Sequence, residues 1–193
     1  MPNWCSTSYV IEGDAKEIQS LYKLMKKLQD RNSPAVKNDF GTTWLGCLVD
    51  ALGKDWNAIS CRGSWSCLEM DGEVLKFNTE TAWAPCNETF DAVRENFPSL
   101  RFYFIAEEPG MEVYETNDEY GVYFKDKFLL EASTPEDEYI HEYFKGRQEA
   151  LKWLENMVGK PIRSVADIED IDRQWNVECE DAYCYLYEFE IVN

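Results

Sequence analysis

The order of strand-like and helix-like segments in the first half of the chain constrains the fold more than any other feature of the sequence. Residues 3–12 have the composition of a strand, and residues 15–30 carry apolar side chains at the spacing of an amphipathic helix. Gly13-Asp14 supplies a turn and a helix cap between them. A second apolar face near residues 43–52, which ends at a glycine, predicts a short extra helix.

The pattern changes to that of strands after residue 59. Asp71-Gly72 is typical of a tight hairpin turn, and the segments on either side of it can pair with each other. A helix is predicted between Pro85 and Pro98. Three further strands are predicted at residues 101–107, 111–116 and 121–131. The order through residue 107 is therefore β-α-(α)-β-β-α-β.

The C-terminal part is predicted to be mainly helical. Residues 134–137, Thr-Pro-Glu-Asp, combine a cap residue, a proline suited to the first helical position and acids for the positive end of the helix dipole, which predicts a helix to about Val158. Ser164 with Asp167 resembles a capping box and predicts a shorter acidic helix that ends near Trp175. A last strand is predicted over residues 182–192, and its one face consists of Tyr183, Tyr185, Tyr187, Phe189 and Ile191.

The element order is that of the split βαβ, or ferredoxin-like, arrangement, in which an antiparallel sheet carries helices on one face. We therefore predict an α+β fold: a ferredoxin-like antiparallel sheet with extra strands and a helical C-terminal extension. Residues 1–132 are expected to form the ferredoxin-like domain with its added strands. Residues 133–193 are expected to form an acidic helical extension with a terminal strand, packed on the same unit.

The chain is strongly acidic but has the composition of a folded protein. It carries 37 Asp and Glu against 19 Lys and Arg, a net charge of -18, and 28 aromatic residues that can build a core. Residues 1–100 hold 14 acidic and 10 basic residues, whereas residues 101–193 hold 23 and 9. This balance argues against a protein that binds by neutralising phosphates, so no direct nucleic-acid binding is expected from the acidic half.

Cysteine usage and the first residues indicate the compartment. The seven cysteines are an odd number, none has the two-residue spacing of a zinc knuckle, and His141 is the single histidine. We therefore expect no metal site, no cofactor and cysteines that are mainly buried. No basic and apolar leader opens the sequence, and no apolar run reaches membrane-spanning length. A reduced, cytoplasmic protein without membrane contact is expected.

Several short motifs together resemble the YubB ferredoxin-like domain family, whose members occur on plasmids and prophages and in bacterial genomes. The motifs are Met1-Pro2-Asn3-Trp4-Cys5, Gly41-Thr42-Thr43-Trp44, Thr81-Ala82-Trp83-Ala84-Pro85, Phe97-Pro98 and Glu107-Glu108-Pro109-Gly110. Their order matches the family over about the first 110 residues. The resemblance implies a ferredoxin-like fold and a mobile-element origin, and it implies no established reaction. The sequence departs from the family at Cys86, where a second proline is more usual, and matches nothing in it after residue 132.

Cys86 and the chain terminus are two candidates for covalent chemistry. Cys86 is expected at the positive end of a helix, where the dipole can favour a thiolate, although a packed or merely exposed thiol is the more common explanation for such a position. Removal of the initiator methionine before Pro2 would leave a secondary amine that can act as a base or nucleophile. No partner acid or base is identifiable for either group, so we assign no catalytic residue.

A set of tryptophans with two carboxylates is the candidate binding groove. Aromatic rings with acids can line a groove for a sugar, a base or a cationic peptide, but core packing explains tryptophans at least as well. Strand alternation is expected to point Glu107 and Glu108 to opposite faces, which argues against an acid/base pair. The full candidate set is Trp4, Trp44, Trp65, Trp83, Glu107 and Glu108.

The acidic helix near residue 170 is the remaining candidate. Regularly spaced carboxylates can imitate the phosphates of DNA, whereas most such charge forms a solvated face. The candidate acidic face consists of Asp167, Glu169, Asp170 and Asp172.

The leading functional hypothesis is a non-enzymatic binding or accessory protein of mobile-element type with a protein partner, and the oligomeric state is left open. The first alternative is an acidic inhibitor that mimics nucleic acid and blocks a DNA-binding protein. A further alternative is a small enzyme that uses Cys86 or cleft carboxylates.

Overall fold

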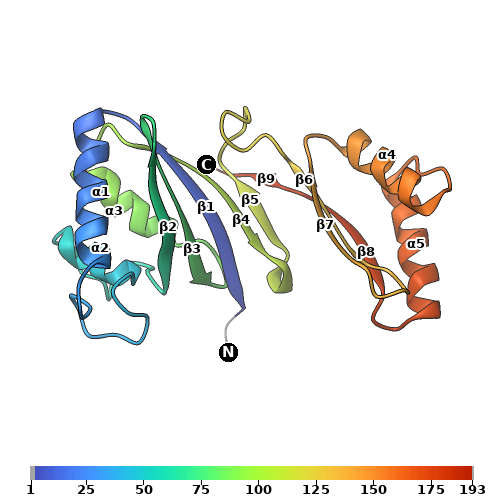
Figure 1. Ribbon diagram of the computed structural model, residues 1–193, viewed down its shortest axis with the longest axis horizontal. Coiled ribbons are helices and arrows are strands. Elements are labelled where there is room, and N and C mark those ends of the chain that lie inside the picture. Colours follow the sequence, from blue (N-terminus) through green and yellow to red (C-terminus); the bar gives the residue numbers. More distant parts are fainter. Residues whose placement is uncertain (1–2, 193) are drawn as a thin grey trace. The chain divides into compact units, whose positions relative to one another are not determined.

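The computed structural model describes residues 3–192, and these residues form an α+β fold with five α-helices and two sheets. The chain divides into two compact units (Figure 1). The first unit ends at Asp118 and also contains Val192. The second unit spans Glu119–Ile191, so it is an insertion within the sequence of the first.

The first unit has the predicted ferredoxin-like order. Its elements are β1 (Trp4–Glu12), α1 (Ala15–Gln29), α2 (Leu45–Ala51), β2 (Gly63–Asp71), β3 (Val74–Ala82), α3 (Asn87–Asn96), β4 (Arg101–Glu108), the 3-10 turn η1 (Pro109–Met111) and β5 (Val113–Thr116). Within this unit the strand order is β2-β3-β1-β4-β5. The two-residue strand β9 (Glu190–Ile191) is the last element of the chain. Strand β1 pairs antiparallel with both β3 and β4. The arrangement β4-β1-β3-β2 is the split βαβ order, and the predicted fold class is confirmed.

The helices of the first unit lie against one face of its sheet (Figure 1). Helix α1 starts where the Asp14 carboxylate accepts the N–H groups of Lys16 and Glu17, at 2.9 and 3.3 Å. Its buried stripe packs onto the face of β1 that carries Tyr9 and Ile11. The rings of Phe77, Phe90 and Phe104 surround Tyr9, with centroids 5.1, 4.3 and 5.9 Å away. This aromatic cluster is the centre of the first core.

The predicted hairpin at Asp71-Gly72 is confirmed. Asp71 pairs with Val74, and Gly72 has φ +62°, a backbone conformation that favours glycine. The ladder between β2 and β3 shifts register between Ser66 and Glu69, where Cys67 has φ +52°. This bulge bends β2 while its two ends stay paired with β3.

The second unit has a sheet and a core of its own. Its elements are β6 (Phe128–Ser133), β7 (Tyr139–Phe144), α4 (Arg147–Val158), α5 (Val165–Glu178) and β8 (Tyr183–Glu188). The strand order is β7-β6-β8, and both pairings are antiparallel. Helices α4 and α5 cover one face of this sheet (Figure 1). Leu130, Leu154 and Ile171 are fully buried between the helices and the sheet.

The predicted helix from residue 134 to Val158 is wrong in its first half. The segment Thr134-Pro135-Glu136-Asp137 is the turn of a β6–β7 hairpin, because the N–H of Asp137 donates to the Thr134 carbonyl and Asp137 has φ +63°. Proline suits the second position of a type I turn as well as the first position of a helix. The alternating residues of 139–144 then favour the strand, and α4 begins only at Arg147.

The division of the chain differs from the predicted one at residue 132. Strand β6 pairs with β7 and β8, so it belongs to the second unit, and that unit is a small α+β body and not a helical extension. The net charge of each part changes with this boundary. The first unit has 19 acidic and 11 basic residues, a balance of -8, and the second has 18 and 8, a balance of -10.

Candidate functional site

The predicted tryptophan groove is not formed as one site. Trp44 and Trp65 belong to the first core, with exposed fractions of 7% and 1%, whereas Trp4 and Trp83 are 44% and 46% exposed. The Trp65 indole N–H donates to Gln29 Oε1 at 3.3 Å. Two of the four rings are therefore core residues, as the packing interpretation expected.

Trp83 and Trp4 lie close together where β3 ends and β1 begins. The N–H of Trp83 donates to the Asn3 carbonyl at 2.9 Å, and Trp4 pairs with Ala82 across the ladder. Trp83 has φ +66°, which is rare for a bulky side chain. The Arg62 guanidinium lies over its ring, 4.9 Å from the centroid. Trp4, Trp83 and Arg62 thus form a small exposed surface, in which Arg62 already covers one face of the Trp83 ring.

Glu107 and Glu108 point to opposite faces of β4, as strand alternation predicts. Glu107 pairs with Ser6 and is half-buried, whereas Glu108 is only 2% exposed and accepts the N–H of Gly110 at 2.9 Å. The two carboxylates therefore do not form an acid/base pair. Glu108 starts the η1 turn, which is a structural role.

Cys86 lies at the N-terminus of α3, as predicted, but it is buried. Burial raises the pKa of its thiol, and a hydrogen bond with the Ser60 hydroxyl, 3.7 Å from Sγ, only partly offsets that effect. Burial and the raised pKa both argue against Cys86 as the candidate reactive thiol. Met1 and Pro2, the second candidate for covalent chemistry, lie outside the described residues.

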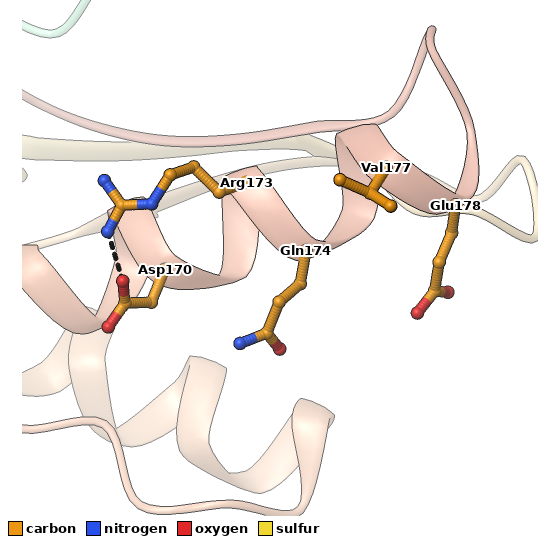
Figure 2. A pocket seen from close by; sticks show the side chains of 5 residues that line it. All are labelled: Asp170, Arg173, Gln174, Val177 and Glu178. Carbon is orange, nitrogen blue, oxygen red and sulfur yellow. Dashed lines mark hydrogen bonds and ion pairs between the residues drawn. The ribbon is translucent and has the colours of Figure 1, made fainter.

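Three of the four candidate acids on α5 have structural partners. Asp167 completes the predicted capping box with Ser164, and hydrogen bonds from the Arg163 N–H and from Ser164 lower the pKa of Asp167. Figure 2 shows Asp170 paired with Arg173, beside a shallow depression that Gln174, Val177 and Glu178 also line. The Asp172 carboxylate accepts the N–H of Cys184 at 3.0 Å and ties α5 to β8. Glu169 is exposed.

The face of the second sheet opposite its helices carries a group of aromatic side chains that we call the tyrosine face. Its members are Tyr139, His141 and Tyr143 on β7, Glu131 on β6, and Tyr183, Tyr185 and Tyr187 on β8. Glu131 pairs with His141 on one side and with Tyr185 on the other, so its carboxylate has an aromatic ring on each neighbouring strand. Tyr139, Tyr143 and Tyr185 are 61%, 41% and 45% exposed.

A chain of hydrogen bonds connects the β7 side of the tyrosine face to Glu131. The Tyr139 hydroxyl donates to Glu131 Oε1 at 3.0 Å and lies 3.2 Å from His141 Nδ1. Because a phenol has one hydrogen, Nδ1 of His141 is the donor to Tyr139. The Nε2 atom of His141, 3.0 Å from the Tyr143 hydroxyl, accepts from it when the ring is neutral. Tyr143, His141 and Tyr139 thus form a continuous series of hydrogen bonds that ends at the Glu131 carboxylate.

The β8 side of the tyrosine face consists of neighbouring rings. Tyr183 and Tyr185 are stacked with centroids 5.6 Å apart, and Tyr185 and Tyr187 are 6.0 Å apart. Burial raises the pKa of Tyr183, and the charges of Glu131 and Tyr185 raise it further, so its hydroxyl remains a neutral donor. The predicted stripe at residues 183, 185 and 187 is present, but Phe189 is buried and lies beyond the end of β8.

The sequence predicted the β8 stripe of this site but not its β7 side. His141 was expected on a helix, because the cap sequence at 134–137 obscured the alternation of Tyr139, His141 and Tyr143 that follows it. That alternation, with aromatic residues at every second position, is the signal that could have identified the strand.

A small cavity of about 100 Å³ also opens on the first unit, between α3 and the end of β5. Its walls include Tyr9, Phe90 and Phe102, with Asn87 and Asn117 among its polar groups. Those polar groups are engaged: Asn87 Oδ1 accepts from the Tyr9 hydroxyl at 3.2 Å, and the Asn117 amide bonds with the backbone of Phe102 and Phe104. Asp91 and Arg94, which form an ion pair with each other, also line the cavity, so its walls combine aromatic rings with polar groups that already have partners.

No protein-family model matches the chain, and no curated protein or solved structure is measurably similar to it. Within residues 3–192, no three His, Cys, Asp or Glu side chains are grouped so that they could hold a metal ion. The helices of that same range are all too short or too polar to cross a membrane.

Proposed function

We propose that the protein is a non-enzymatic binding protein, and that a partner protein contacts it through the tyrosine face. The observation that carries this proposal is the set of partly exposed rings arranged on both sides of Glu131 across three strands. Tyrosine supplies a large contact area with few rotatable bonds and a polar hydroxyl, and it is enriched at protein interfaces.

The two alternatives have less support. An enzyme that uses Cys86 would need an accessible thiolate, whereas this thiol is buried and its pKa is raised. A nucleic-acid mimic would need carboxylates that are available to a basic partner. On α5, however, Asp167, Asp170 and Asp172 bond to the protein itself.

The resemblance to the YubB ferredoxin-like family is part of the same proposal. The β4-β1-β3-β2 order agrees with the fold that the resemblance implies. We infer an accessory protein of mobile-element type that works in the cytoplasm, with the first unit as the family's domain and the second as an added binding module.

A capture experiment tests the proposal. The purified protein is immobilised, incubated with lysate of the cells that produce it, and washed at physiological salt; stoichiometric partners are then identified by mass spectrometry. The variant Tyr139→Ala/Tyr185→Ala is expected to lose the partner, because it removes one ring from each outer strand. Tyr120→Ala is the matched control, since Tyr120 is 86% exposed but lies outside the tyrosine face.

Two further variants separate the alternatives. Trp83→Ala removes the exposed tryptophan edge, and Glu169→Gln/Asp170→Asn removes charge from α5. Both are expected to retain the partner. Capture that survives the double tyrosine variant but is lost with the α5 variant would reject the proposal in favour of the acidic mimic.

A further inference from the structure

The cavity of the first unit lies between one stripe of α3 and the sheet that this helix covers. Its α3 wall consists of residues at the helical period, namely Asn87, Phe90, Asp91 and Arg94. The other wall comes from β1, β4 and the residue that follows β5. All of these residues belong to the first unit, so the cavity is a feature of that unit alone.

The buried lining of the cavity is aromatic. The rings of Phe90 and Phe104 pack on Tyr9 with centroids 4.3 and 5.9 Å away, and the cavity is the space that this packing leaves. The Tyr9 hydroxyl already donates to Asn87, so a ligand in this space meets mainly carbon atoms. An apolar cavity of about 150 Å³ holds benzene, and this one, with about 100 Å³, suits a branched aliphatic group of roughly four carbons.

The mouth of the cavity carries one charge of each sign. Asp91 and Arg94 are the exposed members of the lining, and Arg94 Nη1 lies 3.3 Å from Asp91 Oδ1. An exposed pair at this spacing on a helix contributes little to stability, because water competes for both groups. Each group can therefore exchange its partner for a ligand at small cost. A carboxylate would pair with Arg94, and an ammonium group would pair with Asp91.

One class of small molecule uses both the aromatic interior and the two charges. A lone carboxylate would be attracted by Arg94 but repelled by Asp91, and a lone amine would meet the reverse. A hydrocarbon would use neither charge. A free amino acid carries an ammonium group, a carboxylate and a side chain on one carbon atom, so its two charges can face the mouth while an apolar side chain points inward.

We propose that this cavity binds a free amino acid with a branched aliphatic side chain. The side chain enters the space beside Tyr9, Phe90 and Phe104, the carboxylate pairs with Arg94, and the ammonium group pairs with Asp91. An apolar interior with a few polar groups that fix orientation is the usual form of a small-molecule site. The site uses no residue of the tyrosine face, so it goes beyond the proposed function and does not depend on it.

The direct test is a titration of the isotope-labelled full chain with free leucine, followed by NMR. The side-chain amide signals of Asn87 and Asn117 report on the cavity, and they are expected to shift and to reach saturation. Glycine carries the same charges without a side chain and is expected to bind at least about tenfold more weakly, since each buried methylene contributes about fourfold to affinity. The absence of shifts with leucine, or equal affinities for leucine and glycine, would overturn the inference.

Two analogues of leucine test the role of its charges. Isocaproate has the same branched chain and the carboxylate but no ammonium group, whereas isoamylamine has the ammonium group but no carboxylate. Each is expected to bind about fivefold more weakly than leucine, because it loses one exposed ion pair and meets one like charge at the mouth. If either analogue binds as tightly as leucine, the cavity does not recognise an amino acid.

A pair of double variants tests the two residues at the mouth. Asp91→Asn/Arg94→Gln keeps the cavity but removes its charges, and it is expected to bind leucine at least about fivefold more weakly and to bind leucine and isocaproate alike. Lys54→Gln/Glu95→Gln is the matched control, because it removes another ion pair that involves α3 but does not line the cavity. The control is expected to change the affinity less than about twofold. Equal affinities of the two double variants for leucine would reject the assigned roles of Asp91 and Arg94, and with them the inference.

Discussion

The seven cysteines illustrate how burial sets the chemistry of single residues in this protein. Five of them, Cys5, Cys47, Cys61, Cys86 and Cys184, are buried, Cys179 is half-buried and Cys67 is exposed. Burial raises the pKa of Cys5 and Cys61 to about 11 and that of Cys184 to about 12. At neutral pH these thiols are therefore protonated as well as inaccessible.

Thiol labelling of the native protein is expected to follow this order. Iodoacetamide should modify Cys67 first, because it is the exposed thiol, and should reach Cys86 only when the first unit unfolds. Mass spectrometry of peptides after increasing labelling times measures both rates, and labelling in denaturant provides the reference. Native Cys86 that reacts as fast as Cys67 would contradict the burial argument and revive the reactive-thiol hypothesis.

The position of Cys86 could be predicted from the sequence, but its surroundings could not. Asn87 and the preceding proline indicated where α3 begins, and helix starts depend on neighbouring residues. The burial of Cys86 depends on contacts such as that with Ser60, which is 26 positions away. Contacts at that separation leave no periodic signal in one sequence.

At the scale of elements, α5 is held by the cap at its start and by a polar contact near its middle. The capping box of Ser164 and Asp167 fixes its start, and Asp172 bonds to the backbone of β8. The sequence predicted this helix from its cap, Ser164 with Asp167. It did not predict the partners of the acids, since a helix pattern does not reveal which strand lies beside it.

The Asp172 contact gives a prediction on stability. Asp172→Ala should lower the free energy of unfolding by about 1–2 kcal/mol, because the N–H of Cys184 loses its acceptor. Glu169→Ala, on the same helix but exposed, should change it by less than about 0.5 kcal/mol. Urea denaturation followed by circular dichroism compares the two variants. Similar effects at both positions would show that the contact does not stabilise the fold.

The 134–138 turn shows why an element type can be mistaken when local signals compete. The sequence Thr-Pro-Glu-Asp satisfies a helix start and a type I turn equally well. The choice between them is made by pairing: Ser133 and Tyr139 face each other across the β6–β7 ladder. A single sequence contains no direct record of that pairing, so the strand beyond the turn, and with it the tyrosine face, was missed.

At the scale of the whole molecule, the two units have separate cores. The first is built around Tyr9 and the second around Leu130, Leu154 and Ile171. The fold class and the βαββαβ order of the first unit followed from element patterns alone. The boundary did not, because nothing in the composition of residues 117–127 distinguishes a linker from a surface loop.

The second unit is expected to fold by itself. A fragment of residues 119–191 contains all three strands of its sheet and both covering helices, and it should show a cooperative thermal transition by circular dichroism. Leu130→Ala in that fragment should cost about 2–5 kcal/mol, because Leu130 is fully buried, and should abolish the transition in so small a domain. A fragment that melts without a cooperative transition would show that the unit depends on the rest of the chain.

The return of the chain to the first unit after residue 191 has a consequence for synthesis on the ribosome. The N–H of Val192 donates to the carbonyl of Thr116 at 2.9 Å, although 75 residues separate the two positions. A nascent chain can therefore assemble β1 to β5 early, but their sheet keeps an open edge until the whole second unit has been translated. During that interval the unpaired edge of β5 can pair with strands of other chains. We therefore expect a co-translational chaperone that covers this edge to reduce aggregation of the nascent chain.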